Sequence, residues 1–247
     1  MPQPIAFLFT DFGPAGPYMG QLQAALSGAA PTARVITLQS DAPAGRPRPA
    51  GYLLAALLDE LPADCAVLAV VDPGVGTARR PLVVRADGRW LVGPDNGLLA
   101  PAVRRAKQVD AWRIDWRPAR LSASFHGRDL FAPVCGGLLA GAPPPGAALD
   151  PRELVGADWP ADCAEIVYLD HFGNAMSGLR GSAVPSGAGL ACGPHRLRPA
   201  RVFGEVPAGE AFWYVNSCGL VEIAVNGGSA GQVLGLAVGD PVAVTGG

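Results

Sequence analysis

The sequence lacks the motifs by which common nucleotide-binding, metal-dependent and serine-nucleophile enzymes are usually found. It contains no Walker loop, no Gly-x-Gly-x-x-Gly after a predicted strand, no His-Glu-x-x-His and no Gly-x-Ser-x-Gly. The three histidines, His126, His171 and His195, are scattered and lack the spacing of metal ligands. We therefore expect neither a metal nor a cofactor, and any function must come from less familiar polar clusters.

Charge and paired cysteines are also scarce. Charged residues make up 16% of the chain and the formal net charge is −2, so there is no electrostatic reason to expect nucleic acid or an anionic membrane as a partner. The five cysteines form no Cys-x-x-Cys pair, which is typical of buried thiols in a reducing compartment. With no basic leader and no run of about 20 apolar residues, we expect a cytoplasmic protein without a membrane span.

Hydrophobic residues are plentiful, at 49% of 247 residues, and their pattern divides the chain. Strands are predicted at 5–9, 35–38, 65–71 and 109–114, and helices at 18–30, 50–61 and 130–139, with a proline-rich turn at 46–49. Asp87 and Gly88, between apolar runs at 81–86 and 89–92, predict a hairpin. The first part of the chain is therefore expected to be an α/β sheet domain.

Three consecutive prolines within 141–146 indicate a linker. Beyond it the apolar segments become short and strand-like, at 164–169, 189–192, 211–215, 220–225 and 241–245, separated by glycine and proline turns. We predict an N-terminal α/β domain over 1–142, a linker over 143–160 and a smaller C-terminal all-β, barrel-like domain over 161–247.

The most informative stretch lies at 70–80. A continuous apolar run, typical of a strand buried on both faces, ends on Asp72-Pro73-Gly74, and Arg79 follows closely. In open α/β sheets, ligands bind beyond the carboxyl ends of the strands. Asp72 and Arg79 are therefore expected at a site, and the alternative is a surface turn carrying a solvated ion pair.

Other polar residues follow predicted strands or precede helices. Asp11 comes after the first strand, where a carboxylate can accept hydrogen bonds from two ribose hydroxyls or can simply cap a turn. Asp95 and Asn96 either reach a ligand or only form a tight turn. His126 lies just before a predicted helix and is either structural or functional, and the Arg128 and Asp129 that follow could equally be a helix-start ion pair.

Two polar clusters mark the predicted second domain. Asp170, Phe172 and Asn174 fall within one turn, and Ser217 lies in a segment at 216–222 that precedes the glycines at 227–228. Phe172 could stack on a base while an amide or hydroxyl reads its edge. A hairpin turn explains each cluster nearly as well.

Five segments in order together resemble one family. They are 10–13 with 17–20, 71–77 with Arg79, 92–97, 124–129, and 170–174 with 216–220. From Phe7 to about Pro241, the chain is similar to the S-adenosyl-L-methionine hydroxide adenosyltransferases, also called S-adenosylmethionine hydrolases (adenosine-forming). The bacterial fluorinase and chlorinase are relatives of this family.

The resemblance implies a homotrimer that binds S-adenosylmethionine between the N-terminal domain of one subunit and the C-terminal domain of its neighbour. It also implies that water or hydroxide displaces methionine at the ribose C5′, which gives adenosine and L-methionine. Two alternatives remain: a halogenase that uses chloride or fluoride, and a nucleoside-binding protein without turnover.

The resemblance also implies roles for individual residues. The family's catalytic triad falls on Asp72, Arg79 and His126. The implied substrate contacts are Asp11 for the ribose, Tyr18, Asp95, Asn96 and Phe125 in the first domain, Asp170 and Asn174 for the methionine and nucleoside portions, and Phe172, Ser217 and the backbone near Gly227 on the adenine side. Gly16 stands where many relatives carry an acidic residue near the methionine amine.

Overall fold

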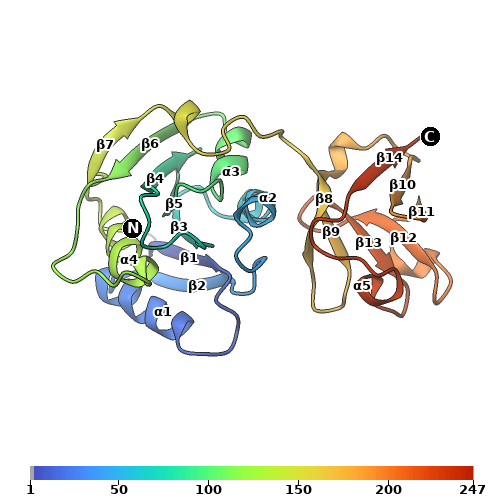
Figure 1. Ribbon diagram of the computed structural model, residues 1–247, viewed down its shortest axis with the longest axis horizontal. Coiled ribbons are helices and arrows are strands. Elements are labelled where there is room, and N and C mark those ends of the chain that lie inside the picture. The colour runs from blue at the N-terminus through green and yellow to red at the C-terminus, as the bar shows by residue number, and fades with distance from the viewer. Residues whose placement is uncertain (1–2, 247) are drawn as a thin grey trace. The chain divides into compact units, whose positions relative to one another are not determined.

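The computed structural model describes residues 3–246, and the chain divides into two compact units between Trp159 and Pro160 (Figure 1). The first unit is a mixed α/β domain and the second is built mainly of strands, as predicted. Among the described residues, no helix is both long and apolar enough to cross a membrane.

Within residues 3–159, the first unit contains seven strands and four α-helices. In chain order they are β1 (Ile5–Thr10), α1 (Tyr18–Ala29), β2 (Arg34–Gln39), α2 (Pro47–Leu57), β3 (Cys65–Val70), β4 (Pro81–Ala86), β5 (Arg89–Pro94), α3 (Ala100–Arg105), β6 (Val109–Ile114), α4 (Ala132–Leu139) and β7 (Gly146–Leu149). Short 3-10 turns follow α2 (Leu58–Glu60) and β7 (Pro151–Glu153), and a π-helical turn, Gly127–Phe131, leads into α4.

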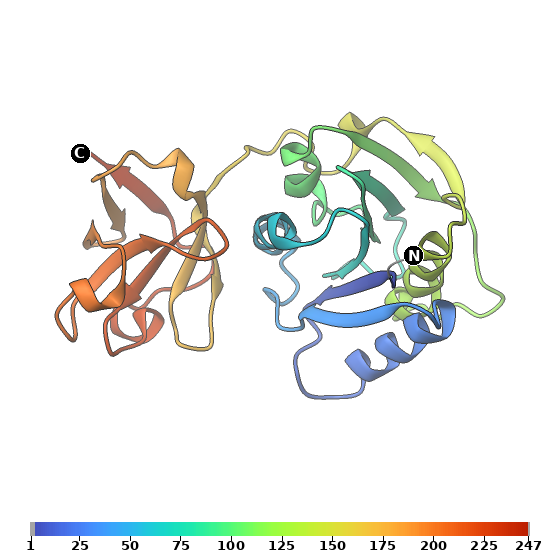
Figure 2. The same ribbon diagram turned by 180° about the vertical axis from the view of Figure 1, so that it is seen from behind.

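These strands form one sheet in the order β2-β1-β3-β5-β4-β6-β7. β2, β1, β3 and β5 are parallel, and β4, β6 and β7 continue the sheet in antiparallel fashion. Figures 1 and 2 show α1 and α4 on one face and α2 and α3 on the other. Both faces of β3 are therefore covered, which explains why its six residues are all buried and read as an unbroken apolar run.

Two expected boundaries differ in the first unit. The helix expected at 50–61 begins at Pro47, because a proline at the first helical position has no N–H to leave unsatisfied, so the expected turn at 46–49 is mostly helix. The segment 143–160, expected to be a linker, carries β7, which pairs with β6 at the sheet edge. Asp115 accepts a hydrogen bond from the backbone N of Ala147 at 3.1 Å and helps to hold this edge.

The described part of the second unit, residues 160–246, contains seven strands and one short α-helix. They are β8 (Cys163–Leu169), β9 (Ala175–Arg180), β10 (Gly189–Cys192), β11 (His195–Pro199), β12 (Ala211–Val215), β13 (Leu220–Val225), α5 (Ala230–Val233) and β14 (Val242–Thr245). Two 3-10 turns lie at Gly181–Ala183 and Phe203–Glu205. The four-residue helix α5 is an exception to the expected all-β composition.

The second sheet is nearly closed. Its strand order is β14-β10-β11-β12-β13-β9-β8, and all neighbours are antiparallel except β11 and β12. Ile166 in β8 exchanges backbone hydrogen bonds with Gly239 and Asp240, just before β14, so the first and last strands of this order are joined. The barrel-like architecture predicted from sequence is confirmed, with a core formed by inward residues such as Ile166, Trp213 and Ile223.

Candidate functional site

A cavity of about 230 Å³ lies beyond the carboxyl ends of β1 and β3 in the first unit. This is the position that the sheet topology favours for ligands. It brings together Asp11, Tyr18, Asp72, Phe125 and His126 from the sequence predictions. The remaining lining residues are Phe12, Gly45, Val70, Pro73, Val75, Ser124 and Gly127.

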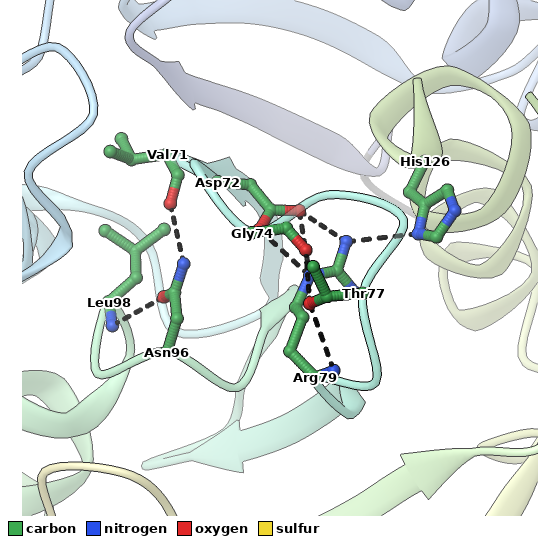
Figure 3. A network of polar contacts seen from close by, with 8 residues as sticks. All are labelled: Val71, Asp72, Gly74, Thr77, Arg79, Asn96, Leu98 and His126. Atoms are coloured by element: carbon green, nitrogen blue, oxygen red, sulfur yellow. Dashed lines mark hydrogen bonds and ion pairs between the residues drawn. The ribbon is translucent and has the colours of Figure 1, made fainter. Parts of the chain in front are cut away.

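Asp72 and Arg79 form a buried ion pair beside this cavity (Figure 3). Arg79 Nε lies 2.9 Å from both carboxylate oxygens of Asp72, and Arg79 Nη2 also contacts Asp72 Oδ2. The side chain of Arg79 is only 9% exposed and that of Asp72 only 4%, so the alternative of a solvated surface pair is wrong. Such a fork-on-carboxylate contact fixes the plane of the guanidinium.

The loop between Asp72 and Arg79 is held against the segment that carries His126. Gly76 has a φ of +79°, and a Cβ built there would lie 2.5 Å from the carbonyl oxygen of Ala123. Only glycine permits this approach. Within the loop, the Thr77 hydroxyl donates to the carbonyl of Gly74 at 2.7 Å. The two loops thus converge, which the triad implied by the family resemblance requires.

His126 begins the π-helical turn that leads into α4. Asp129 accepts a hydrogen bond from the backbone N of Ser122 at 2.8 Å and pairs with Arg128 at 2.6 Å, which fixes the loop before the histidine. The Arg128-Asp129 pair is therefore the helix-start ion pair considered from the sequence.

The geometry assigns the tautomer of His126. Arg79 Nη2 lies 3.1 Å from His126 Nδ1, and a guanidinium can only donate hydrogen bonds. Nδ1 must therefore accept, and the neutral ring carries its proton on Nε2. Burial, and then the positive charge of Arg79, lower the pKa of His126 below 6.5, which favours this neutral form.

Asp11 and three aromatic rings complete the wall of the first cavity. Asp11 Oδ2 accepts from the backbone N of Gly45 at 2.8 Å, and burial is the main cause that raises the pKa of this carboxyl. Phe12, Tyr18 and Phe125 meet edge to face, with ring centroids 5.6 to 6.2 Å apart. The wall thus joins one carboxylate to an aromatic surface suited to a flat or cationic organic ligand.

Asp95 and Asn96 do not line this cavity. Asp95 pairs with Arg80 at 2.6 Å and accepts from the backbone N of Val155 at 2.9 Å. Asn96 donates to the carbonyl of Val71 at 2.9 Å and accepts from the backbone N of Leu98 at 3.2 Å (Figure 3). Their polar atoms are thus committed to the protein, and the turn interpretation of this motif describes their contacts.

The second unit has a larger cavity of about 770 Å³. All five residues that the sequence analysis singled out in this domain line it: Asp170, Phe172, Asn174, Ser217 and Gly227. Phe172 is 76% exposed, so its ring is available for stacking, whereas Asn174 is 6% exposed. Asp170 accepts from the backbone N of Asn174 at 2.8 Å and from its side-chain Nδ2 at 3.1 Å.

Three further residues of this cavity, Tyr214, Asn216 and Glu222, received no role from the sequence. Glu222 is 1% exposed, and it accepts hydrogen bonds from the hydroxyl of Tyr214 and from Asn216 Nδ2. The sequence did contain a signal for Glu222, which is the single acidic residue in the otherwise apolar run 220–225. Burying a carboxyl is costly unless it is hydrogen-bonded, so such a residue is a candidate for a specific role.

No group of three or more His, Cys, Asp or Glu residues that could hold a metal ion occurs within residues 3–246.

Comparison with known proteins places both units in one family. The model of the SAM hydroxide adenosyltransferase N-terminal domain matches residues 6–147, and that of the C-terminal domain matches residues 164–243. The chain is 42% identical to the (R)-S-adenosyl-L-methionine hydrolase of Salinispora arenicola over 96% of each chain. It is 41% identical to the enzyme of the same name from Thermus thermophilus, covering 97% of this chain and 98% of that protein.

Solved structures agree with the fold. A crystal structure of an uncharacterized conserved protein from Thermotoga maritima matches 98% of this chain and all of its own, with a TM-score of 0.87 and 29% identity. A conserved hypothetical protein from Thermus thermophilus matches 98% of this chain and 99% of its own, with a TM-score of 0.78 and 36% identity.

Proposed function

The chain belongs to the SAM hydroxide adenosyltransferase family, and we propose that it hydrolyses S-adenosyl-L-methionine to adenosine and L-methionine. The observation that carries this proposal is the partly buried cluster of Asp72, Arg79 and His126 beside the cavity that Asp11 also lines. Curated relatives bear the name (R)-S-adenosyl-L-methionine hydrolase, so we propose the (R) sulfonium epimer as the substrate.

The reaction requires that an oxygen nucleophile be positioned at C5′ of the ribose. A water or hydroxide oxygen bonds to C5′ of the ribose, the C5′–S bond breaks, and sulfur keeps the electron pair as the thioether of methionine. One proton passes to solvent. Because sulfonium is already a good leaving group, positioning and electrostatics carry most of the catalysis.

Each member of the cluster has a distinct proposed role. Arg79, oriented by Asp72, favours the deprotonated form of the water through its positive charge. His126 accepts a hydrogen bond from Arg79 at Nδ1, so its proton is on Nε2. The Nε2–H group therefore donates a hydrogen bond to the attacking oxygen, and the ring does not act as a general base. Asp11 accepts hydrogen bonds from the ribose hydroxyls, and Tyr18 and Phe125 pack against the substrate.

We further propose a homotrimer in which the second unit of another copy supplies Asp170, Phe172, Asn174, Ser217 and the Gly227 backbone to the substrate. Two observations support this: the proposed contacts are divided between two cavities, and each cavity has polar groups fitted to part of a nucleoside or an amino acid. The proposed partners are therefore the small-molecule substrate and further copies of this chain.

The test is product analysis with the full chain. Each sulfonium epimer is incubated separately in ¹⁸O-water, with and without excess chelator, and products are identified by mass spectrometry. We expect methionine and adenosine labelled at the 5′ oxygen, with turnover unaffected by the chelator. A 5′-halo-5′-deoxyadenosine formed in chloride or fluoride would instead establish a halogenase, and bound ligand without turnover would establish a nucleoside-binding protein.

Variants assign the reaction to the first cavity. His126→Ala is expected to lower the single-turnover rate by about 100-fold or more, because it removes a group that acts on the nucleophile. Asp11→Ala should mainly weaken substrate binding, since ribose contacts exist before and during the reaction. Near-wild-type turnover in both Asp72→Ala and His126→Ala would contradict the proposed roles of the cluster.

A further inference from the structure

The guanidinium of Arg79 makes one further contact, with an aromatic ring that the proposed reaction does not use. Its central carbon lies over the ring of Phe131, 5.3 Å from the ring centroid. Phe131 is fully buried, in the same core cluster as Val70 at the end of β3. A cation over an aromatic face is attracted by the ring quadrupole, and the attraction is stronger where water is excluded. Phe131 therefore stabilises the charged group as well as filling the core.

Asp72 and His126 hold the same guanidinium through hydrogen bonds (Figure 3). Arg79 Nε and Nη2 donate to Asp72, and Nη2 also lies 3.1 Å from the accepting Nδ1 of His126. A rigid planar group that is held at two places can still rotate about the line that joins them. The Phe131 ring provides a third contact, which opposes this rotation.

The backbone between His126 and Phe131 explains how both side chains reach one guanidinium. The two residues are five positions apart, and in an α-helix of 3.6 residues per turn such residues point about 140° apart around the axis. The segment Gly127–Phe131 is instead a π-helical turn, in which the backbone N of Ala132 donates to the carbonyl of Gly127. This wider turn brings residues five apart to nearly the same side, and such turns are frequent at functional sites.

We propose that Phe131 is a positioning residue: the π-helical turn places its ring against Arg79, so that the guanidinium keeps donating to His126 Nδ1. This rests on the proposed function, in which the Nε2–H group of His126 donates to the attacking oxygen. Phe131 does not line the cavity, so it acts through Arg79. Without the ring the guanidinium can tilt away from Nδ1, and the other tautomer of His126 becomes populated.

The first test is the kinetics of Phe131→Leu, which removes the ring and keeps an apolar side chain. Its kcat should fall by about 10- to 100-fold, the scale of a small misplacement of a catalytic group. Its KM should change by less than about twofold, because interactions made equally in the ground state are retained. The proposed ribose contact of Asp11 is one of these.

Phe7→Leu is the matched control, because it removes the same ring from the other side of the sheet. Ala6 and Leu8 of β1 pack in the core cluster that contains Phe131. Since side chains alternate along a strand, the intervening Phe7 faces the opposite side. This variant should lose stability and keep the wild-type kcat.

The second test needs neither substrate nor turnover, because it follows the titration of His126 by NMR. Burial, and then the positive charge of Arg79, lower the pKa of His126, so a displaced guanidinium should let this pKa rise toward 6.5 in Phe131→Leu. A double-mutant cycle shows whether the effect passes through Arg79. In an Arg79→Gln background, Phe131→Leu should cause no further rise, whereas a change in the burial of the imidazole would raise the pKa in both backgrounds.

A wild-type kcat or a wild-type His126 pKa in folded Phe131→Leu would overturn the proposal, and so would an equal rise of the pKa in both backgrounds. Thermal melting checks that each variant is folded. If Phe131→Leu does not fold, phenylalanines with one, two and three ring fluorines at position 131 decide in its place. They nearly keep the shape of the ring and weaken its attraction for a cation step by step, so the His126 pKa should rise along the series.

An unchanged His126 pKa across the fluorinated series would likewise overturn the proposal. The titration reports the contact of Arg79 with His126 even if the chain does not hydrolyse S-adenosylmethionine. Failure of the proposed hydrolysis and failure of the Phe131 proposal are therefore separate results.

Discussion

At His126, burial and the charge of Arg79 together set the protonation state of one imidazole ring. Protonation would place an N–H at Nδ1, facing a guanidinium that can only donate. The groups acting on the ring are Arg79 and Arg117, which lower its pKa, and Asp72 and Asp129, which raise it. The loss of solvent and the positive neighbours lower the pKa of His126 more than the two carboxylates raise it, so the ring is neutral at pH 7.

This predicts the titration of His126 directly. By NMR, with the signal assigned through His126→Gln, the pKa should lie below the ordinary value of 6.5. Arg79→Gln removes the second largest cause and should raise the pKa without restoring 6.5, because burial remains. Asp72→Asn removes an opposing charge and should lower it further. A wild-type pKa at or above 6.5 would contradict the assigned tautomer.

The same shift has a consequence for stability. Between the folded pKa and 6.5, the unfolded chain binds more protons at this site than the folded chain, so the contribution of His126 to the free energy of unfolding rises with pH. It is complete above 6.5 and is lost as the pH falls to the folded pKa. Denaturant unfolding of wild type and His126→Gln at several pH values reports this difference.

At 94–97 the residues favoured a tight turn, whereas the resemblance implied substrate contacts, and the contacts of Asp95 and Asn96 in the structure are those of the turn. Asp72, Arg79 and His126 follow or precede regular elements and converge because glycine permits close loops. Asp95 and Asn96 look the same in sequence, since side chains that form turns are also the side chains that bind ligands. Only the positions of Arg80, Val71 and Val155 in space show that these two are already satisfied.

At the scale of elements, the end of β3 is held in place by a side chain. The pairing of β3 with β5 ends at Leu68 and Val92, two residues before β3 itself ends. Beyond that point Asn96 reaches across from the turn after β5 and donates to the carbonyl of Val71, next to Asp72. The side-chain amide of Asn96 thus provides a hydrogen bond to this segment where the backbone pairing of β3 with β5 has ended.

Asn96→Ala is therefore expected to affect both stability and rate. It leaves the fully buried Val71 carbonyl without its amide donor, which should lower the free energy of unfolding by about 1–3 kcal/mol. It should also lower kcat, even when kcat is measured well below the melting temperature of the variant, because Asp72 loses its fixed position. Urea unfolding and single-turnover kinetics measure the two effects.

Arg89→Ala provides the control for this prediction. Arg89 donates to the carbonyl of Leu61 at 2.6 Å, but it lies at the amino end of β5, away from the cavity. It should lower stability without lowering kcat. If Asn96→Ala kept the wild-type kcat, the end of β3 would not depend on this hydrogen bond for its catalytic geometry.

Some elements escaped the sequence analysis for physical reasons. β9 contains Ser177 and Gly178, which weaken its strand pattern, yet a Cβ at Gly178 would lie 2.5 Å from the Cβ of Cys163 on the neighbouring strand. β11 has one buried residue, Leu197, among polar and half-exposed neighbours. Besides the preceding strand, β9 pairs with β13 and β11 pairs with β12, and local patterns do not report pairing with such later strands.

At the scale of the whole molecule, composition predicted two units and a second unit from 161, close to its start at Pro160, but it ended the first unit too early, at 142. The change from helix-and-strand to short strands was sufficient to predict the two fold classes. The prolines near 144 do not end the first unit, because Arg80 and Asp95 bind the backbone at Glu153 and Val155 and so attach this segment to the sheet. Long-range bonds of this kind are invisible in a single sequence.

The division of the proposed contacts between two units makes the assembly testable by mixing defective subunits. His126→Ala disables the first unit and Asp170→Ala the second. If one copy's first unit works with another copy's second unit, co-expressed and doubly tagged trimers should recover about one third of the wild-type rate per site, because every mixed trimer contains one intact site in three. If each site belongs to one chain, every site is defective and no recovery occurs.

A mixture of Asp72→Ala with His126→Ala is the matched control, because both defects lie in the first unit and no combination of copies yields an intact one. It should remain inactive under either arrangement. Light scattering on the same samples should give three times the 25.3 kDa of one chain. A fully active monomer, or equal recovery in both mixtures, would contradict the shared site, whereas recovery in only the first mixture is explained only if different copies contribute to each site.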